Sequence, residues 1–514
     1  MSDQLTGVAR TICRQWVSAL LMAVSLTGAA SAADALLRPA GLEPDIAFWR
    51  QIFAEVSTNE ALTHDNRHLN IVYATVDLSD AATDTARQRR LDAAKDHYIK
   101  ILKRLASGDC KNLGKDERRV LALWADRPGN ATLRAAADRV RIQQGLSDRY
   151  REGLIRSGRW ETHIRQSLRL QGVPEQLAAL PHVESSFNPE ARSYAGAAGL
   201  WQFTVGTGRR FMRIDSAVDE RRDPYRSSEA AARLLKANYG ELDSWPLAIT
   251  AYNHGTGGMR RAMRDLGTNN IETIMRNYDG PSFGFASRNF YVSFLAAEEV
   301  ERTAEKYFGP VQREEPEHLT VIAVPAYLSI KTLEQAFGIS REALQAYNPA
   351  LLPPIWTGKK YVPRGLVLHL PDSLSGAEAG ARLADISTTQ MRTAQIQDPA
   401  PRTHRVRRGD TVSGIAARYG TSSATVARLN GLSRKNLIRV GQVLKLPGSA
   451  APSAGPANSS SRSTYVVRRG DSLSVIAKRT GVPQRQLMAL NDLDNANRLY
   501  PGQRLRLTKS GEGS

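Results

Sequence analysis

Cysteine is almost missing from this sequence, which has two in 514 residues. Cys13 lies in an N-terminal apolar segment, so Cys110 stands alone in the rest of the chain. A single thiol excludes an intramolecular disulfide and a cysteine-based metal cluster. The nine histidines show no metal-ligand spacing either. We expect no metal and no cofactor, and we expect Cys110 to be a buried structural thiol.

Long apolar runs are missing after the N-terminal segment, so we expect a soluble mature protein. At the N-terminus, Arg10 and Arg14 precede an apolar segment that ends in the small-x-small sequence Ala30-Ser31-Ala32. This pattern is typical of a secretory signal peptide over residues 1–32, with a retained membrane anchor as the alternative. Cys13 follows an isoleucine, whereas a lipidated cysteine usually follows a small residue. We therefore expect no lipid anchor, while membrane association by other means stays possible.

Negative charge is in short supply: 51 acidic residues face 70 basic ones, for a formal net charge of +19. This balance suits a polyanionic partner such as nucleic acid, an anionic membrane surface or a bacterial wall. The sequence contains no zinc-finger, RNP-type or basic-helix signature. We therefore expect no nucleic-acid partner.

A repeat dominates the C-terminal part. "HRVRRGDTVSGIAARYGTSSATVARLNGL" aligns without a gap on "YVVRRGDSLSVIAKRTGVPQRQLMALNDL". Each copy reads as strand, helix, helix, strand, which predicts modules at 404–447 and 464–508. A weaker copy with "LEQAFGISREALQAYNPAL" spans 319–371 and lacks the Arg-Gly-Asp loop. The Gly/Ala/Ser/Pro-rich segments 372–403 and 448–463 are expected to be flexible linkers.

The chain upstream of the repeats is predicted to be helical. Apolar residues recur at spacings of three and four in "RLDAAKDHYIKILKRLA" and "NFYVSFLAAEEVERTAEKYF", and no run of alternating strands is evident. We expect a helical N-terminal region over 34–150 and a compact domain over 151–312.

One carboxylate of this domain stands in an apolar run. In "VPEQLAALPHVESSF" the apolar spacing predicts a helix that begins at Pro174, with Glu184 near its end beside Phe187. A carboxyl group held against apolar surface keeps its proton near neutral pH, because its charged form is disfavoured. That property suits a general acid acting on a glycosidic oxygen. A buried glutamate satisfied by a backbone N–H or an arginine is the alternative.

Two further segments carry groups that suit a sugar. "SYAGAAGLWQF" places Ser193, Gln202 and Phe203 around a backbone so poor in side chains that a bulky ligand can lie against it. "WPLAITAYNHGTGG" places Tyr252 and Asn253 at the end of an apolar helix stopped by glycine. A tyrosine, an amide and a glutamine fit a sugar with an acetamido group.

The motifs "ESSFNP", "AGAAGLWQF" and "AYNHG" resemble those of soluble-type lytic murein transglycosylases, which have a goose-lysozyme-like fold. The lead-in "VPEQLAALPHVESSFNP" and the trailing modules resemble most the membrane-bound lytic murein transglycosylase D group, over about residues 150–310 and 319–508. The repeats resemble lysin motif (LysM) modules, which bind N-acetylglucosamine polymers. One departure is Trp201, where many relatives have methionine. The resemblance implies a mostly α fold, with a lysozyme-like α-helical catalytic domain followed by small βααβ LysM modules.

The resemblance also implies a reaction. Glu184 would be the sole acid/base in cleaving the β-1,4 bond between N-acetylmuramic acid and N-acetylglucosamine, and the muramic C6 hydroxyl would replace water to give a 1,6-anhydro end. The residues implied to bind substrate are Ser193, Gln202, Phe203, Tyr252 and Asn253. Peptidoglycan strands would be the partner, in the periplasm or cell envelope of a bacterium.

In the LysM modules the resemblance implies a shallow groove between the loop after the first strand and the segment before the last strand. The groove would read acetamido groups largely through backbone contacts. The glycan-binding residues implied are Asp410, Thr411, Asn430, Asp471, Ser472 and Asn491.

Two other functions remain open. A hydrolase of peptidoglycan or chitin needs a second carboxylate. Asp215, Asp219, Asp223 and Glu229 lie downstream, but their segment is predicted to be a solvated polar loop that leads into a helix. His182, beside Glu184, is expected to be structural. A non-catalytic wall-binding scaffold is the other alternative, against which the complete set of motif residues counts.

Overall fold

The structure is a computed structural model, and its described residues form two compact units divided after Ile396. The described residues are 36–108, 110–124, 128–396, 402–407, 409–432, 437–447, 464–467, 471–480, 482–491, 493, 499 and 503–507. The predicted signal peptide and the predicted linker 448–463 lie outside them. Within them, no helix has the length and apolar character needed to cross a membrane.

The N-terminal part of the first unit contains a small antiparallel sheet of order β2-β1-β3. Its strands are β1 (Glu60–Asp65), β2 (Val72–Asp77) and β3 (Val140–Gln144). The expectation of a helical region without alternating strands is wrong here. All but the first residue of β1 are buried, and they include Thr63, His64 and Asp65. A strand buried on both faces shows no apolar–polar alternation, so the pattern that reveals a strand is missing.

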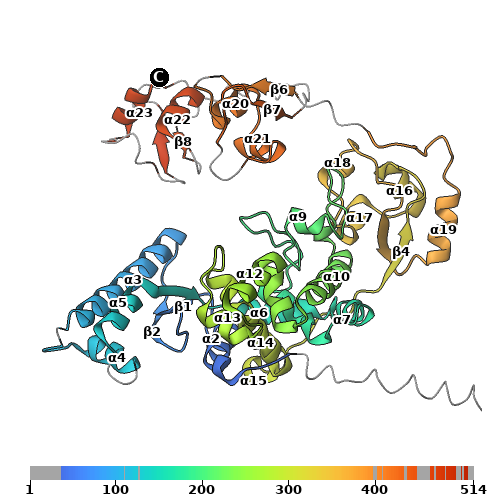
Figure 1. Ribbon diagram of the computed structural model, residues 1–514. Coiled ribbons are helices and arrows are strands. Elements are labelled where there is room, and N and C mark those ends of the chain that lie inside the picture. Colours follow the sequence, from blue (N-terminus) through green and yellow to red (C-terminus); the bar gives the residue numbers. More distant parts are fainter. Residues whose placement is uncertain are drawn as a thin grey trace, which may run out of the picture. The chain divides into compact units, whose positions relative to one another are not determined.

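Three helices beside this sheet form a cluster with a core of its own (Figure 1). They are α3 (Asp84–Ala106), α4 (Lys115–Leu123) and α5 (Asn130–Arg139). The apolar spacing predicted α3, and its buried face carries Tyr98, Ile101, Leu102 and Leu105. Cys110 lies in the α3–α4 connection and is exposed, so the expected buried thiol is wrong.

A larger helical bundle follows, with one core. Its elements are α6 (Ser147–Ser157), α7 (Glu161–Leu170), η3 (Glu175–Ala179), α8 (Leu180–Ser185), α9 (Val205–Gly208), η4 (Glu220–Arg222), α10 (Pro224–Leu242), α11 (Trp245–His254), α12 (Thr256–Leu266), α13 (Ile271–Asn277), α14 (Phe285–Arg302) and α15 (Ala304–Phe308). The early helix α2 (Glu43–Ala54), which follows η2 (Ala40–Leu42), packs against α14 and joins the same core. Residues on every side of α14 are buried from Ser287 to Ala297, as expected for a central helix.

The weak repeat has the expected strand–helix–helix–strand order, with one short helix added. Its elements are β4 (Leu319–Ala323), α16 (Ile330–Phe337), α17 (Arg341–Tyr347), α18 (Pro353–Trp356) and β5 (Val367–Pro371). The strands β4 and β5 pair antiparallel.

The next segment is not the flexible linker expected over 372–403, at least as far as residue 396. It forms α19 (Gly376–Ala384), capped by Ser375, and Ala379, Leu383 and Ile386 enter the core of the repeat. Small residues dominate its composition, but the three- and four-residue spacing of these side chains gives it an apolar face to bury.

The second unit holds the two strong repeats, and both have the βααβ order. The first comprises β6 (Arg402–Arg405), α20 (Val412–Arg418), α21 (Ser423–Leu429) and β7 (Val443–Leu446). The second comprises β8 (Thr464–Val466), α22 (Leu473–Thr480), α23 (Gln484–Leu490) and β9 (Arg504–Arg506). In each, the first strand pairs antiparallel with the last. The mostly helical fold with small α+β modules is thus confirmed.

Candidate active site

Glu184 lies one residue before the end of α8. Pro174 starts the helical run, which is 3₁₀ up to Ala179 and α-helical afterwards. The run ends because Ser186 and Phe187 both take positive φ values, 51° and 54°. This sharp end buries the Phe187 ring and leaves the Glu184 side chain half-buried.

The carboxyl group of Glu184 stands without a charged partner in the part of the chain that the structure describes. Burial alone raises its pKa to about 8. Among the described residues, none forms an ion pair with the Glu184 carboxylate. A desolvated carboxyl group of this kind is protonated at neutral pH, as a general acid must be.

The side of α8 that faces the core is aromatic. The ring of His182 stacks on Tyr150 at 4.3 Å between centroids and meets the edge of Phe187 at 4.5 Å. Burial holds the pKa of His182 well below its usual value, so the imidazole is neutral. His182 therefore fixes α8 from within, which is the structural role expected for it.

The small-residue segment forms a folded loop against α8. Isolated bridges pair Ala198 with both Arg192 and Phe203, and the Ser185 hydroxyl donates to the Leu200 carbonyl oxygen at 2.8 Å. We call residues 191–203 the substrate loop. The indole of Trp201 is fully buried and donates to the Ser228 hydroxyl at 2.8 Å.

The two polar residues predicted from this loop also stabilise it. The Gln202 Nε2 group donates to the carbonyl oxygens of Ala191 (3.1 Å) and Gly199 (2.9 Å), so a substrate contact through Gln202 has only its amide oxygen to use. The exposed Ser193 accepts a hydrogen bond from the Ala197 N–H at 3.0 Å. Their substrate contacts stay a prediction.

Tyr252 joins this loop to the end of α11. Its hydroxyl donates to the Trp201 carbonyl oxygen at 2.8 Å, and its ring lies parallel to Phe290 at 6.3 Å between centroids. Burial, and after it the nearby Glu184 carboxylate, raise the pKa of Tyr252 well above its usual value. The hydroxyl therefore stays neutral beside the acid. Phe203 is buried and meets the Tyr252 ring edge-on, so its position supports that ring and leaves little surface for a sugar.

Asn253 lies next to Tyr252 and is exposed. Its Oδ1 accepts a hydrogen bond from the buried Ser287 hydroxyl on α14 at 2.7 Å. This bond uses the amide oxygen, so the Nδ2 group of the exposed Asn253 is a candidate donor to an acetamido carbonyl. Gly255, with φ of 83°, ends α11 as the sequence predicted.

The charged segment before α10 was expected to be solvated; Asp215 is exposed as expected, but the expectation is wrong from Asp219 to Asp223. Asp219, Glu220 and Asp223 are buried, as is Arg221. Sequence reasoning missed Arg221, because a buried Asp–Arg pair and a solvated one have the same composition. One residue could have pointed to this contact: position 199 is a glycine, and an added Cβ there would lie 1.7 Å from the Arg221 carbonyl oxygen.

Arg221 connects the charged segment before α10 with the substrate loop. Its guanidinium binds both oxygens of Asp219, at 2.8 and 2.7 Å. Its Nη1 donates to the carbonyl oxygens of Gly196 (2.8 Å) and Phe203 (3.0 Å), close to the two ends of the tight turn that carries Gln202.

The four downstream carboxylates considered for a second catalytic role all have partners. Asp215 accepts the N–H groups of residues 217 and 218, and Asp219 binds Arg221. Asp223 caps α10, and Glu229 pairs with Arg226 at 2.6 Å. Within the described ranges, no three His, Cys, Asp or Glu side chains gather as a metal site would require.

In the strong repeats the predicted loop residues shape the loop after the first strand. Asp410 accepts from the Arg407 N–H at 2.8 Å and pairs with His404 at 2.7 Å, while Thr411 caps α20. In the other repeat, Asp471 accepts from the Tyr465 hydroxyl at 2.8 Å, and Ser472 accepts from a backbone N–H of α22.

One asparagine in each repeat, at the end of the second helix, forms a hydrogen bond with the backbone of the last strand. The three are Asn348, Asn430 and Asn491. In Asn430 the Nδ2 group donates to the carbonyl oxygens of Val426 and Lys445, and Oδ1 accepts from the Lys445 N–H at 2.7 Å. Both Nδ2 protons are thereby engaged. A glycan contact for Asn430 and Asn491 stays a prediction, and their observed contacts hold the module together.

The chain matches known families over these same segments. Residues 161–275 match the family described as "Transglycosylase SLT domain". Residues 404–447 and 465–508 match the family described as "LysM domain". The third repeat lies outside both matches.

Individual proteins match as well. The chain is 30% identical over 384 residues to the membrane-bound lytic murein transglycosylase D of Escherichia coli K12, covering 72% of this chain and 81% of that protein. It is 47% identical over 116 residues to an N-acetylmuramoyl-L-alanine amidase of Staphylococcus saprophyticus, covering 22% and 34% of the two chains. Among solved structures, the 70 kDa soluble lytic transglycosylase of Escherichia coli matches at 18% identity with a TM-score of 0.25, covering 43% of this chain and 35% of that one.

Proposed function

The chain belongs to the family of lytic murein transglycosylases, and from that premise we propose that it cleaves the β-1,4 bond between N-acetylmuramic acid and N-acetylglucosamine with Glu184 as its single acid/base. The observation that supports this proposal is the position of Glu184: it is half-buried at the end of α8, has no ion-pair partner among the described residues, and lies close enough to Tyr252 to raise the pKa of that hydroxyl. Each of the four other candidate carboxylates is already hydrogen-bonded or ion-paired. A two-carboxylate hydrolase therefore lacks its second group among them.

A single carboxyl group can serve both steps of this reaction. Glu184 gives its proton to the glycosidic oxygen while the bond from that oxygen to the muramic C1 breaks. The resulting carboxylate then takes the proton of the muramic C6 hydroxyl as O6 attacks C1. The ring closure forms a 1,6-anhydro bond and consumes no water, because a held intramolecular hydroxyl reacts at high effective concentration.

The neighbouring groups orient the sugar. The Nδ2 group of the exposed Asn253 would donate to the acetamido carbonyl, since the Ser287 hydroxyl binds the Oδ1 end of the amide. Tyr252 and the substrate loop shape the surface beside Glu184. The two LysM modules would add weak glycan sites on the same polymer, which gain avidity when linked. The net charge of +19 adds attraction to an anionic wall in the periplasm or cell envelope.

The products test this proposal directly. Purified sacculi digested by the full chain should release muropeptides that are lighter by one water than reducing-end fragments, as read by mass spectrometry. Reducing ends in their place would establish a hydrolase. Sacculus binding without any released product would establish a scaffold.

We expect the activity to fall as the pH rises through about 8, because only the protonated form of Glu184 can act as the acid and burial raises its pKa to about 8. Below that pH the acid form predominates, so kcat/KM should be nearly constant between neutral pH and about pH 7.5. The measurement is a kcat/KM profile on soluble glycan chains between pH 6 and pH 10. A profile that rises through pH 8 would contradict the assignment.

A further inference from the structure

The third repeat is built into the catalytic bundle. Its hydrophobic core includes Ala217 and Val218, which come from the loop before α10. Val218 forms an antiparallel bridge with Leu351. On either side of this bridge, the Asp219 N–H donates to the carbonyl oxygen of residue 350 at 2.8 Å, and the N–H of residue 352 donates to the Ala217 carbonyl oxygen at 2.9 Å.

A second contact lies at the start of α10. His369 on β5 is buried, with its Nδ1 3.9 Å from the Asp223 carboxylate that caps this helix. Its ring also meets the Tyr225 ring at 4.9 Å, and the Tyr225 hydroxyl donates to Glu317 at 3.1 Å. The repeat therefore holds the loop from Ala217 to Asp223 at both ends.

That loop holds the substrate loop. Asp219, whose N–H is bonded to the repeat, binds the guanidinium of Arg221 through both oxygens. Arg221 in turn binds the carbonyl oxygens of Gly196 and Phe203. Three links thus run from the repeat through Asp219 and Arg221 to the turn that carries Gln202.

The other face of the repeat is covered by its own chain. Leu328 and Val362 bridge the two loops between which a LysM groove is expected, and Tyr327 forms a further bridge with Arg392. The side-chain amide of Gln395 binds both the N–H and the carbonyl oxygen of Tyr361.

The strong repeat at 404–447 leaves the matching position open. The Gly365 N–H donates to Val324 and the Gly441 N–H donates to Val406, and each of these valines follows the first strand of its repeat. When the two glycines are aligned, Tyr361 and Leu437, each four residues earlier, occupy the same position. Leu437 is 73% exposed.

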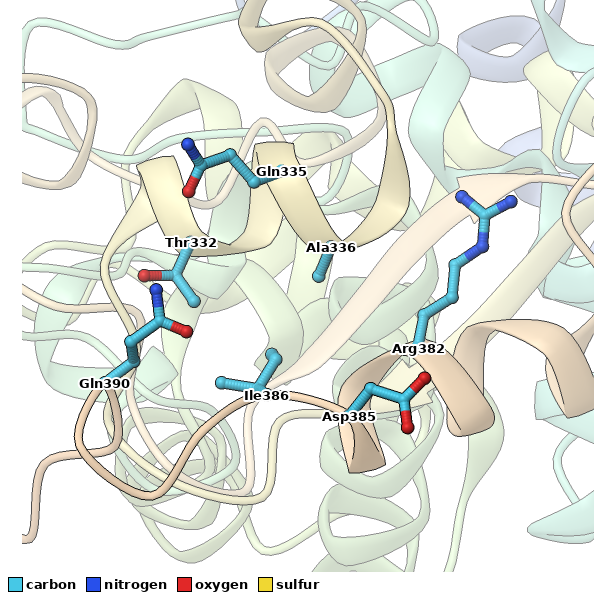
Figure 2. A pocket seen from close by; sticks show the side chains of 7 residues that line it. All are labelled: Thr332, Gln335, Ala336, Arg382, Asp385, Ile386 and Gln390. Carbon is cyan, nitrogen blue, oxygen red and sulfur yellow. The ribbon is translucent and has the colours of Figure 1, made fainter.

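The covering segment, residues 386–396, also closes over α16. Figure 2 shows Ile386 and Gln390 facing Thr332 and Ala336, with a polar hollow of about 280 Å³ left between them. Ile386 is buried in the core of the repeat. The backbone groups of Tyr327 and Tyr361 that a glycan would read are thus already bonded to Arg392 and Gln395.

We propose that residues 319–396 form a brace that positions the substrate loop through Asp219 and Arg221, and that they are not a third glycan-binding module. The proposal rests on the proposed function for its kinetic consequence, but the mechanical coupling is measurable without it. Arg221 is a positioning residue, since it contacts the loop backbone and not the reacting atoms.

A double-mutant cycle in the full chain tests the brace. Leu351→Ala leaves the backbone bonds in place but removes the side chain that packs in one core with Ala217 and Val218, so it should loosen this contact. It should lower kcat about tenfold, because a small misplacement of a substrate-positioning group costs that much or more, with KM and sacculus binding unchanged. Arg221→Lys, which loses the forked contact, should lower kcat at least as much. The double variant should be no slower than Arg221→Lys, because both changes break the same connection. Multiplied losses would overturn the proposal.

The matched control is Leu383→Ala, the same truncation at a buried position of the same core, but on α19 and without a bond to the bundle. Its kcat should stay within about twofold of the wild type. Hydrogen exchange of residues 191–203 should rise in Leu351→Ala and not in Leu383→Ala, whether or not anhydro products form. Equal exchange in both variants would overturn the brace. Val218→Ala serves in the same cycle if Leu351→Ala does not fold.

Discussion

Glu184→Gln is expected to lower the release of muropeptides about 10³-fold, in the range that removing a general acid–base group costs. Glutamine has nearly the same shape but no proton of suitable acidity to give to the glycosidic oxygen. Its neutral amide replaces a carboxyl group that is itself neutral at pH 7, so folding and sacculus binding should not change. The measurement is the initial rate of soluble product release, with thermal unfolding and sacculus pull-down recorded alongside.

The matched control for this variant is Glu301→Gln. Glu301 is a second buried glutamate, on α14, whose pKa is raised to about 7 by burial and by the nearby Glu161. Its Oε2 lies 3.9 Å from the Nε2 of His182, inside the bundle. Glu301→Gln should therefore change the rate of product release only a few-fold. If the two variants lost activity equally, the loss would reflect damage to the bundle. If Glu184→Gln kept a tenth of the activity or more, Glu184 would not be the acid.

Gly199→Ala is expected to lower kcat about 10²-fold, because the substrate loop must shift to make room for the added methyl group and a shift of about 1 Å near the reacting groups costs that much. The added Cβ would lie 1.7 Å from the Arg221 carbonyl oxygen, and residue 199 has a φ of +80° that alanine adopts poorly. Backbone on both sides of the contact must move apart. The unfolding temperature should fall as well, and steady-state kinetics with a thermal melt would measure both effects.

Gly196→Ala separates the two causes. Gly196 has a φ of +83°, nearly that of Gly199, but an added Cβ would have no atom within 4 Å. The variant should therefore lose only about 1–2 kcal/mol of stability, the cost of placing a non-glycine residue in a left-handed conformation, and it should keep most of its activity. Similar losses in the two variants would assign the effect to backbone strain and not to the Arg221 contact.

The sequence predicted those parts of the site that have local signals. A proline start, three- and four-residue apolar spacing and a glycine stop placed Glu184 and Tyr252 at helix ends, where the structure has them. The small residues of the substrate loop predicted a backbone that a ligand can approach, which stays a prediction; at Gly199 the close neighbour in the structure is the Arg221 carbonyl oxygen. These signals work because each depends on the conformation of a few neighbouring residues.

Features that depend on distant partners were not predictable in this way. Asp219 and Arg221 look like surface charges until the third repeat and the substrate loop close over them. The strand β1 carries polar residues that its two neighbours bury, so it has no alternation to read. Helix α19 has the composition of a linker, and only the apolar core that it covers reveals its role.

The position of α2 has a consequence for anyone who cuts the protein into pieces. The matched segment 161–275 leaves out α2 and α14, although these two helices pack on each other in the middle of the bundle. A fragment trimmed to that segment would expose the apolar surfaces that Ile46, Ile52 and Phe294 now fill, and would aggregate in place of folding. An expressible catalytic fragment has to start ahead of Glu43, more than a hundred positions upstream of the recognised family signature.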